Sequence, residues 1–156
     1  MNYFPEYVQL ALSEVPGEIS VAIPLAFCGH RCKGCHSPQY QDRNGGKFML
    51  LEDLNQICEK YKSKASCVLF FGGEYDSERL CRMIKICKQF EFKVALYSGY
   101  DLWELDPKLV GMLDYIKCGS YIEELGGLDK KGTNQRLWKR VDGELVDITA
   151  EMQRGV

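Results

Sequence analysis

The feature that most constrains the fold of this chain is an alternation of short apolar runs with amphipathic segments. The apolar runs occupy residues 19–23, 67–71, 93–97 and 115–118. Short, nearly continuous apolar runs are typical of strands that are buried on both faces of a sheet. The predicted order of elements is therefore β-α-β-α-β-α-β, in a mainly parallel sheet.

The segments between these runs carry apolar residues at helical spacing. The two clearest stripes are Leu54, Ile57, Cys58 and Tyr61, and Leu80, Met83, Ile84 and Cys87. A further short helix is expected after Asp106, because Asp106 and Pro107 form a good N-cap and first-turn pair. Eight full β/α units would need a longer chain, so the expected fold class is α/β with a partial, open (β/α) barrel.

The length of 156 residues fits a single domain that spans residues 1–156. Near the end of the chain, residues 137–148 are predicted to form a hairpin around Asp142 and Gly143, a common turn sequence. The net charge of -2 gives no reason to bind nucleic acid or an anionic membrane. Since there is also no long apolar run and no signal sequence, a soluble cytoplasmic protein is expected.

Eight cysteines in such a chain indicate metal binding or redox chemistry, because cytoplasmic thiols are kept reduced. Three of them are clustered, at Cys28, Cys32 and Cys35. The others are scattered through apolar segments and are predicted to lie in the core. These five are Cys58, Cys67, Cys81, Cys87 and Cys118.

The clustered cysteines supply three thiolates with the spacing C-x3-C-x2-C. A structural zinc ion normally has four protein ligands, and an electron-transfer 4Fe-4S cluster has four cysteines. Three cysteines would leave one iron of a 4Fe-4S cluster open to bind another molecule. In the alternative, His30 or His36 completes a zinc site, although zinc ligands more often show a repeated C-x2-C spacing.

Unusual motifs also follow the other predicted strands. They are Gly72-Gly73-Glu74, Tyr97-Ser98-Gly99-Tyr100 and Lys117-Cys118-Gly119. Ligand sites in parallel β/α folds lie beyond the carboxyl ends of the strands. The cysteine loop and these three motifs are therefore expected to converge on one rim.

The C-x3-C-x2-C spacing just after a first strand resembles the signature of the radical S-adenosylmethionine (SAM) superfamily. Gly72, Gly73 and Glu74 are similar to the GGE element of that superfamily, whose backbone carbonyls receive the amino group of SAM. The resemblance implies a partial barrel of the radical SAM type. It also implies a 4Fe-4S cluster on the three clustered cysteines, with SAM bound to the open iron.

More narrowly, the chain resembles the activating enzymes of anaerobic (class III) ribonucleotide reductases, which are unusually small. The shared segments are residues 28–38, 97–100 and 133–136, the last of which reads Thr-Asn-Gln-Arg. The resemblance implies an oxidoreductase that takes an electron from an external one-electron reductant such as flavodoxin and cleaves SAM reductively. The resulting radical would abstract hydrogen from a glycine of the large reductase subunit, which is the implied protein partner.

The candidate contacts of SAM and the cluster are Gly72, Gly73, Glu74, Ser98, Lys117 and His36. Lys117 is a cation at the end of an otherwise apolar strand, where a carboxylate or a ribose hydroxyl could pair with it. The resemblance implies no catalytic residue beyond the cluster and SAM, in agreement with a chain that shows no pairing of a nucleophile with a base.

Two other functions stay open. The first is another radical SAM enzyme, either the activase of a different glycyl radical enzyme or a small-molecule enzyme related to deazapurine synthesis. The short chain argues against the small-molecule enzyme, because such enzymes need more residues to enclose a substrate. The second is a zinc-binding interaction module.

Overall fold

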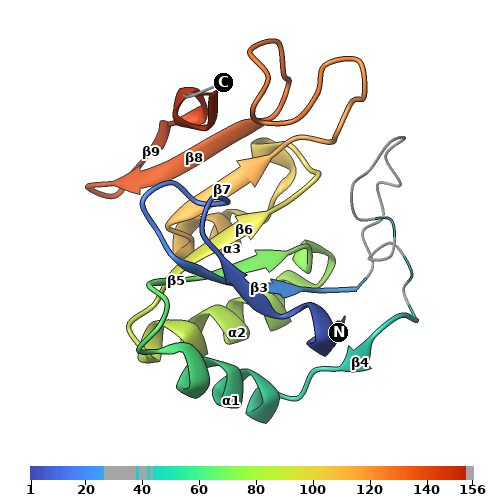
Figure 1. The fold of residues 1–156 in the computed structure, drawn as a ribbon, viewed down its shortest axis with the longest axis vertical. Helices are drawn as coiled ribbons and strands as arrows, with labels where there is room; N and C mark the ends of the chain where they lie inside the picture. Colours follow the sequence, from blue (N-terminus) through green and yellow to red (C-terminus); the bar gives the residue numbers. More distant parts are fainter. Residues whose placement is uncertain (27–37, 39–41, 43, 154–156) are drawn as a thin grey trace.

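The computed structural model describes residues 1–26, 38, 42 and 44–153. Its main sheet has seven strands in the order β2-β3-β5-β6-β7-β8-β9 (Figure 1). Their bounds are β2 Gln9–Ala11, β3 Ser20–Pro24, β5 Cys67–Phe71, β6 Lys93–Tyr97, β7 Tyr115–Cys118, β8 Arg136–Val141 and β9 Glu144–Asp147. A separate two-stranded ladder pairs β1 (Asn2–Tyr3) with β4 (Lys47–Phe48).

The centre of the main sheet is parallel. Strands β3, β5, β6 and β7 pair in parallel, whereas β2, β8 and β9 add antiparallel pairs at the two sides. The four strands predicted from the apolar runs are confirmed, with β3 displaced by one residue. The predicted hairpin is also confirmed, since β8 and β9 pair around Asp142 and Gly143, which both have positive φ. The antiparallel strand β2 was not predicted, and the partial barrel stays a prediction.

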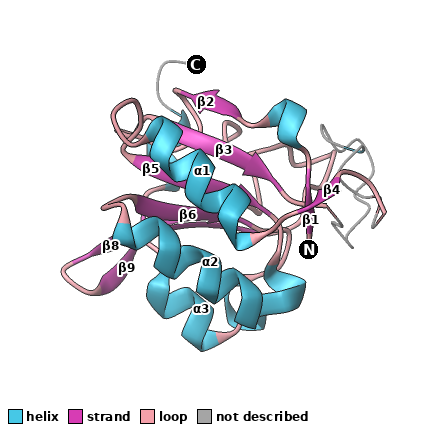
Figure 2. Cartoon of the chain, turned by 90° about the horizontal axis from the view of Figure 1, so that it is seen from below, coloured by secondary structure: helices cyan, strands magenta, loops and turns pink. Residues whose placement is uncertain are grey.

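Three α-helices pack on one face of the sheet (Figure 2). They are α1 (Leu51–Tyr61), α2 (Ser77–Gln89) and α3 (Pro107–Met112). The predicted cap of α3 is confirmed, because Asp106 Oδ1 accepts a hydrogen bond of 2.9 Å from the backbone N–H of Lys108. Short 3-10 helices are η1 (Pro5–Tyr7), η3 (Glu74–Asp76), η4 (Leu102–Glu104) and η5 (Thr149–Gln153). No helix in the described ranges is long and apolar enough to cross a membrane.

Both faces of the parallel strands are buried, which explains why their sequences are continuously apolar rather than alternating. On the helix side, alternate strand residues pack against the apolar stripes of α1 and α2 in the larger core. On the other side, Leu69, Ala95 and Tyr115 pack with Val15 in a smaller core. The five scattered cysteines are all buried free thiols, as predicted.

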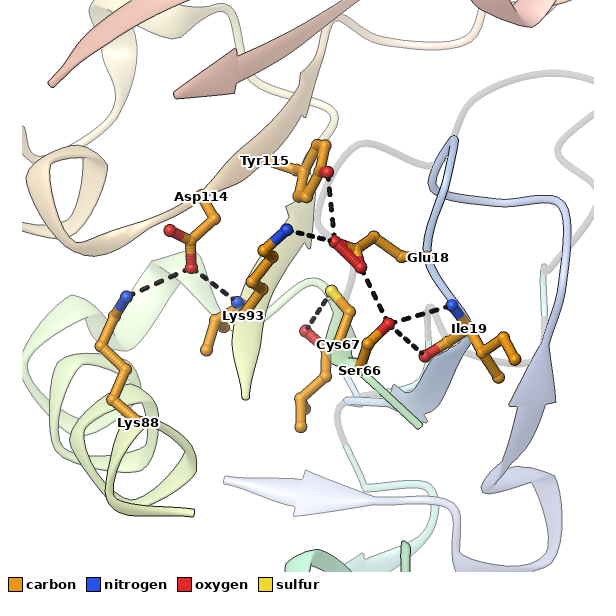
Figure 3. A network of polar contacts seen from close by, with 10 residues as sticks. Glu18, Ile19, Ser66, Cys67, Lys88, Lys93, Asp114 and Tyr115 are labelled. Atoms are coloured by element: carbon orange, nitrogen blue, oxygen red, sulfur yellow. Dashed lines mark hydrogen bonds and ion pairs between the residues drawn. The ribbon is translucent and has the colours of Figure 1, made fainter. Parts of the chain in front are cut away.

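A buried polar network closes the amino edge of the parallel strands (Figure 3). Glu18, in the loop before β3, contacts Ser66, Lys93 and Tyr115. Lys93 and Tyr115 are the first residues of β6 and β7, and Ser66 directly precedes β5. The network therefore holds this loop over the smaller core, at the edge opposite to the predicted ligand rim.

Candidate functional site

The predicted ligand motifs follow parallel strands at one edge of the sheet. The last residues of the central strands lie in a single row, in which Phe71 pairs with Pro24 and Tyr97, and Tyr97 pairs with Lys117. Parallel strands in register present their carboxyl ends at the same edge, so the segments that follow them are neighbours. We call this side of the sheet the carboxyl edge.

The predicted cluster ligands Cys28, Cys32 and Cys35, together with His36, lie outside the described residues. Within the described ranges, no group of three or more His, Cys, Asp or Glu side chains is placed to hold a metal ion. The segment that leads to the cysteines is described as far as residue 26. The backbone N–H of Leu25 donates to the carbonyl of Phe71 at 3.0 Å, so the end of β3 is attached to the end of β5.

The two glycines after β5 adopt a backbone that requires glycine. Gly72 has φ +83° and Gly73 has φ +97°, both in the left-handed region that L side chains rarely adopt. A Cβ on Gly73 would lie 2.6 Å from Cδ1 of Leu25, which is itself buried. The sequence motif therefore corresponds to a tight turn packed against the residue that leads into the cysteine loop.

Glu74 carries the clearest sign of a ligand site in the described part of the chain. Its Oε2 atom is buried and has no hydrogen-bond partner among the described residues. Burial raises the pKa of the Glu74 carboxyl, while the Ser98 hydroxyl and the Lys117 ammonium act in the opposite direction. Three predicted site residues from three different strand ends are therefore brought together.

Ser98 is almost completely buried and organises the backbone of this edge. Its N–H donates to the carbonyl of Lys117 at 2.8 Å, and its Oγ accepts from the N–H of Tyr100 at 3.1 Å. The carbonyl of Tyr100 in turn accepts from the N–H of Gly119 at 2.8 Å. The Ser98 hydroxyl therefore stabilises the turn after β6 in addition to contacting Glu74.

Lys117 lies on the sheet face opposite the helices, in a row with two aromatic rings. Its Nζ is 5.7 Å from the ring centroid of Tyr97, a cation–π distance. The rings of Phe71 and Tyr97 meet edge to face, with centroids 5.5 Å apart. This aromatic row was not predicted. Alternation along a strand relates only side chains of that strand, and it is the register of β5, β6 and β7 that places Phe71, Tyr97 and Lys117 on one face.

The segment 133–136 closes the loop between β7 and β8. Thr133 Oγ1 donates to the carbonyl of Gly126 at 3.0 Å, and Gln135 Nε2 donates to the carbonyl of Gly119 at 3.2 Å. Asn134 Nδ2 donates to the carbonyl of Ser120 at 3.0 Å, whereas its buried Oδ1 has no partner among the described residues. These side chains hold the loop at the carboxyl edge, beside the end of β7.

The geometry of the described edge suits a ligand with an amino group. A buried carboxylate oxygen without a partner is expensive unless a donor reaches it. An ammonium group would supply a charge-assisted hydrogen bond to Glu74, and Lys117 offers a complementary contact for an anionic or hydroxyl group of the same ligand.

Comparison with known proteins gives a family match and a related enzyme. The chain matches the family described as a 4Fe-4S single cluster domain over residues 16–146. It is also 31% identical over 98 residues to the pyruvate formate-lyase-activating enzyme of Clostridium pasteurianum, which covers 58% of this chain and 41% of that enzyme. The chain thus spans less than half the length of this curated relative. No solved structure matches the chain significantly.

Proposed function

Because this chain belongs to the 4Fe-4S single cluster domain family, we propose that it is a radical SAM activating enzyme that generates a glycyl radical on an anaerobic ribonucleotide reductase. In this proposal Cys28, Cys32 and Cys35 hold a 4Fe-4S cluster with one open iron. The reduced cluster and SAM, when bound, supply the radical chemistry. The electron comes from an external one-electron reductant such as flavodoxin.

The observation that carries the proposal is the buried, unpartnered Oε2 of Glu74 directly after two left-handed glycines. This arrangement fits the amino group of the methionine part of SAM, because an ammonium can donate to the carboxylate and to backbone carbonyls of the same turn. Lys117 would pair with the carboxylate or a ribose hydroxyl. Ser98 would hold the neighbouring turn, and His36 would contact the cofactors from the cysteine loop.

Two comparisons support the general part of the proposal, which is that the chain is a 4Fe-4S radical SAM activase. The family match supports a 4Fe-4S protein, and the relative, which is named as the activating enzyme of pyruvate formate-lyase, supports a radical SAM activase whose substrate is a protein. The finer assignment to a ribonucleotide reductase depends on the resemblances in segments 97–100 and 133–136.

A second target has its own support. The identity to the enzyme from Clostridium pasteurianum favours a glycyl radical enzyme of the pyruvate formate-lyase type. An activase for either target would use the same cluster, SAM and carboxyl-edge residues. The two assignments therefore differ only in the protein that receives the radical.

The test is a comparison of the two partners. Anaerobically purified protein should be brown, contain iron and sulfide, and cleave SAM to 5′-deoxyadenosine when reduced. Incubation with the large subunit of the anaerobic ribonucleotide reductase should then give a glycyl radical doublet in the EPR spectrum. Deuterium from a Cα-labelled glycine of that subunit should appear in 5′-deoxyadenosine.

Each alternative predicts a different result in the same experiment. A radical on pyruvate formate-lyase and none on the reductase would transfer the assignment to the second target. SAM cleavage with a radical on neither protein would leave only a radical SAM enzyme. A colourless protein with zinc and without iron would instead support the zinc-binding module.

A further inference from the structure

Two large aromatic side chains are exposed at the carboxyl edge. Trp103, in η4, is 83% exposed, which is the highest value among the large hydrophobic residues that the structure describes. Tyr75, in η3, is 43% exposed. Tryptophan is usually largely buried, and exposed aromatic residues are enriched at protein–protein interfaces.

The segments that carry these two rings are neighbours. Ser77 Oγ donates a hydrogen bond of 2.8 Å to Asp106 Oδ2, which joins the start of α2 to the start of α3. Tyr75 lies two residues before Ser77, and Trp103 lies three residues before Asp106. Helices α2 and α3 also pack against each other, so η3 and η4 belong to one surface.

This surface is acidic for a local structural reason. Asp76 and Asp106 cap α2 and α3, and Asp101 and Glu104 form the capping box of η4. Such caps require negatively charged or polar side chains at successive helix starts. Segments 74–78 and 101–106 contain no Lys or Arg, and the positive charge that lies close to Asp76 is the N-terminal ammonium of Met1.

The nearest cation along the chain after η3 is engaged elsewhere. Arg79 Nη2 donates to the carbonyl of Met49 at 2.8 Å, and its guanidinium lies over the ring of Phe48. The first cation along the chain after η4 is Lys108, which follows the N-cap of α3. We call the surface formed by Tyr75, Trp103 and Glu104, which are exposed, and by Asp76 and Asp101, which are partly exposed, the aromatic–acidic rim.

We propose that the aromatic–acidic rim is the docking surface for a Lys- or Arg-bearing segment of the glycyl radical protein that this chain activates; the inference rests on the proposed function. A cation can stack on an exposed indole ring while its charge pairs with the flanking carboxylates. Anionic partners such as nucleic acid or an acidic membrane are disfavoured by the same charges.

The aromatic–acidic rim is adjacent to the proposed SAM site. Tyr75 directly follows Glu74, whose unpartnered carboxylate marks the proposed SAM site. A partner held at the rim would therefore have its reacting loop beside the cofactors. Burial of Trp103 by the partner would also exclude water from that side of the site.

The test uses three variants of the full chain with the cluster in place. Trp103→Ser removes the ring, and Glu104→Lys reverses a charge of the rim. The control is Leu12→Ser, because Leu12 is 74% exposed and follows β2 at the opposite, amino edge of the sheet. Two quantities are measured: SAM cleavage without partner, and the concentration of the reductase large subunit that gives half-maximal glycyl radical.

We expect Trp103→Ser and Glu104→Lys each to raise the half-saturating reductase concentration about tenfold or more, as for a central interface residue. SAM cleavage without partner should be unchanged in all three variants, and Leu12→Ser should titrate like the wild type. Added salt should weaken the wild-type interaction more than that of Glu104→Lys.

Two negative results are distinguishable. A wild-type chain that activates the reductase, with unchanged half-saturation in Trp103→Ser and Glu104→Lys, overturns the docking surface alone. A wild-type chain that cleaves SAM but produces no radical on the reductase overturns the proposed target, and with it the partner assigned to the rim.

Discussion

Glu18 and Lys93 form an ion pair of 2.7 Å in which the carboxylate side chain is 5% exposed and the lysine side chain 56% exposed. The same carboxylate accepts hydrogen bonds from Ser66 Oγ at 2.8 Å and from the hydroxyl of Tyr115 at 3.4 Å. One buried group thus connects the loop before β3 to the starts of three strands. Its loss would leave several donors without a partner.

We predict that Glu18→Ala lowers the free energy of unfolding by about 2–4 kcal/mol, because it removes a buried carboxylate that accepts hydrogen bonds from Ser66 and Tyr115. The control is Glu59→Ala, which removes an exposed ion pair of 2.6 Å with Lys62. This variant should lower the free energy of unfolding by less than about 0.5 kcal/mol. Urea unfolding of both variants is the measurement, and equal effects would contradict the structural role given to Glu18.

Alanine substitutions of Gly72 and Gly73 should lower the free energy of unfolding by different amounts. Gly72→Ala places a Cβ at left-handed φ in open surroundings, where its nearest atom is the Leu25 carbonyl oxygen at 3.8 Å. The expected loss is about 1–2 kcal/mol of unfolding free energy. Gly73→Ala should cost more, since its Cβ also overlaps Cδ1 of the buried Leu25 at 2.6 Å. Urea unfolding of the two variants checks this order, and equal losses would show that Leu25 moves aside freely.

Gly73→Val is predicted to abolish SAM binding while the cluster remains, because a branched side chain would distort the turn that precedes Glu74. The measurement is the change in the EPR signal of the reduced cluster when SAM is added. Gly111→Val serves as a control, since nothing lies within 4 Å of a Cβ at that position. An unaltered SAM response in Gly73→Val would place the SAM site elsewhere.

Glu74→Gln should affect the stability of the chain and its affinity for SAM in opposite directions at neutral pH. Burial raises the pKa of Glu74 above its ordinary value of 4.5, so the folded chain binds this proton more tightly than the unfolded chain. The contribution of Glu74 to stability is therefore greatest below pH 4.5 and is lost as the pH rises through the raised pKa.

Because glutamine stays neutral, Glu74→Gln should be more stable than the wild type at neutral pH, and this advantage should vanish below pH 4.5. Its affinity for SAM should fall about tenfold or more, because a charge-assisted hydrogen bond is lost. Unfolding across this pH range and a SAM titration are the two measurements. A variant less stable than the wild type at every pH would contradict the assigned burial penalty.

Each of Cys28→Ala, Cys32→Ala and Cys35→Ala should abolish assembly of the cluster, since three thiolates are the minimum for a site with one open iron. The controls are Cys81→Ala and Cys87→Ala, which alter buried free thiols of the core. The controls should retain iron and sulfide. Full iron loading of Cys32→Ala would contradict the assignment of the cluster ligands.

Much of the parallel centre of the sheet was predictable. The runs 67–71, 93–97 and 115–118 coincide with β5, β6 and β7, because strands buried on both faces must be apolar throughout. The antiparallel strand β2 was missed, since its three residues are mostly exposed and have no apolar run. Local patterns identify an element where burial has shaped its composition, or where a turn sequence such as Asp142-Gly143 marks it.

The position of the candidate site at one edge of the sheet was predictable from the sequence, but the contacts among its side chains were not. Strand order put Gly72, Ser98 and Lys117 at one expected edge. That the carboxylate of Glu74 lies near Ser98 and Lys117, with its buried Oε2 unpartnered among the described residues, became visible only in the structure. The exposure of Trp103 was equally hidden, because an aromatic residue in a short turn fits a core as well as a surface.

The sequence by itself determined features that depend on residues close together in the chain: the spacing of the three clustered cysteines, the strands of the parallel sheet, and the hairpin turn at Asp142 and Gly143. The tertiary structure alone decided the contacts between Glu18 and Lys93, between Ser77 and Asp106, and along the row of Phe71, Tyr97 and Lys117. These pairs are separated by tens of residues. Whether they meet depends on how the elements are arranged in space, and a shift of register by one residue would turn Phe71, Tyr97 or Lys117 to the opposite face of the sheet.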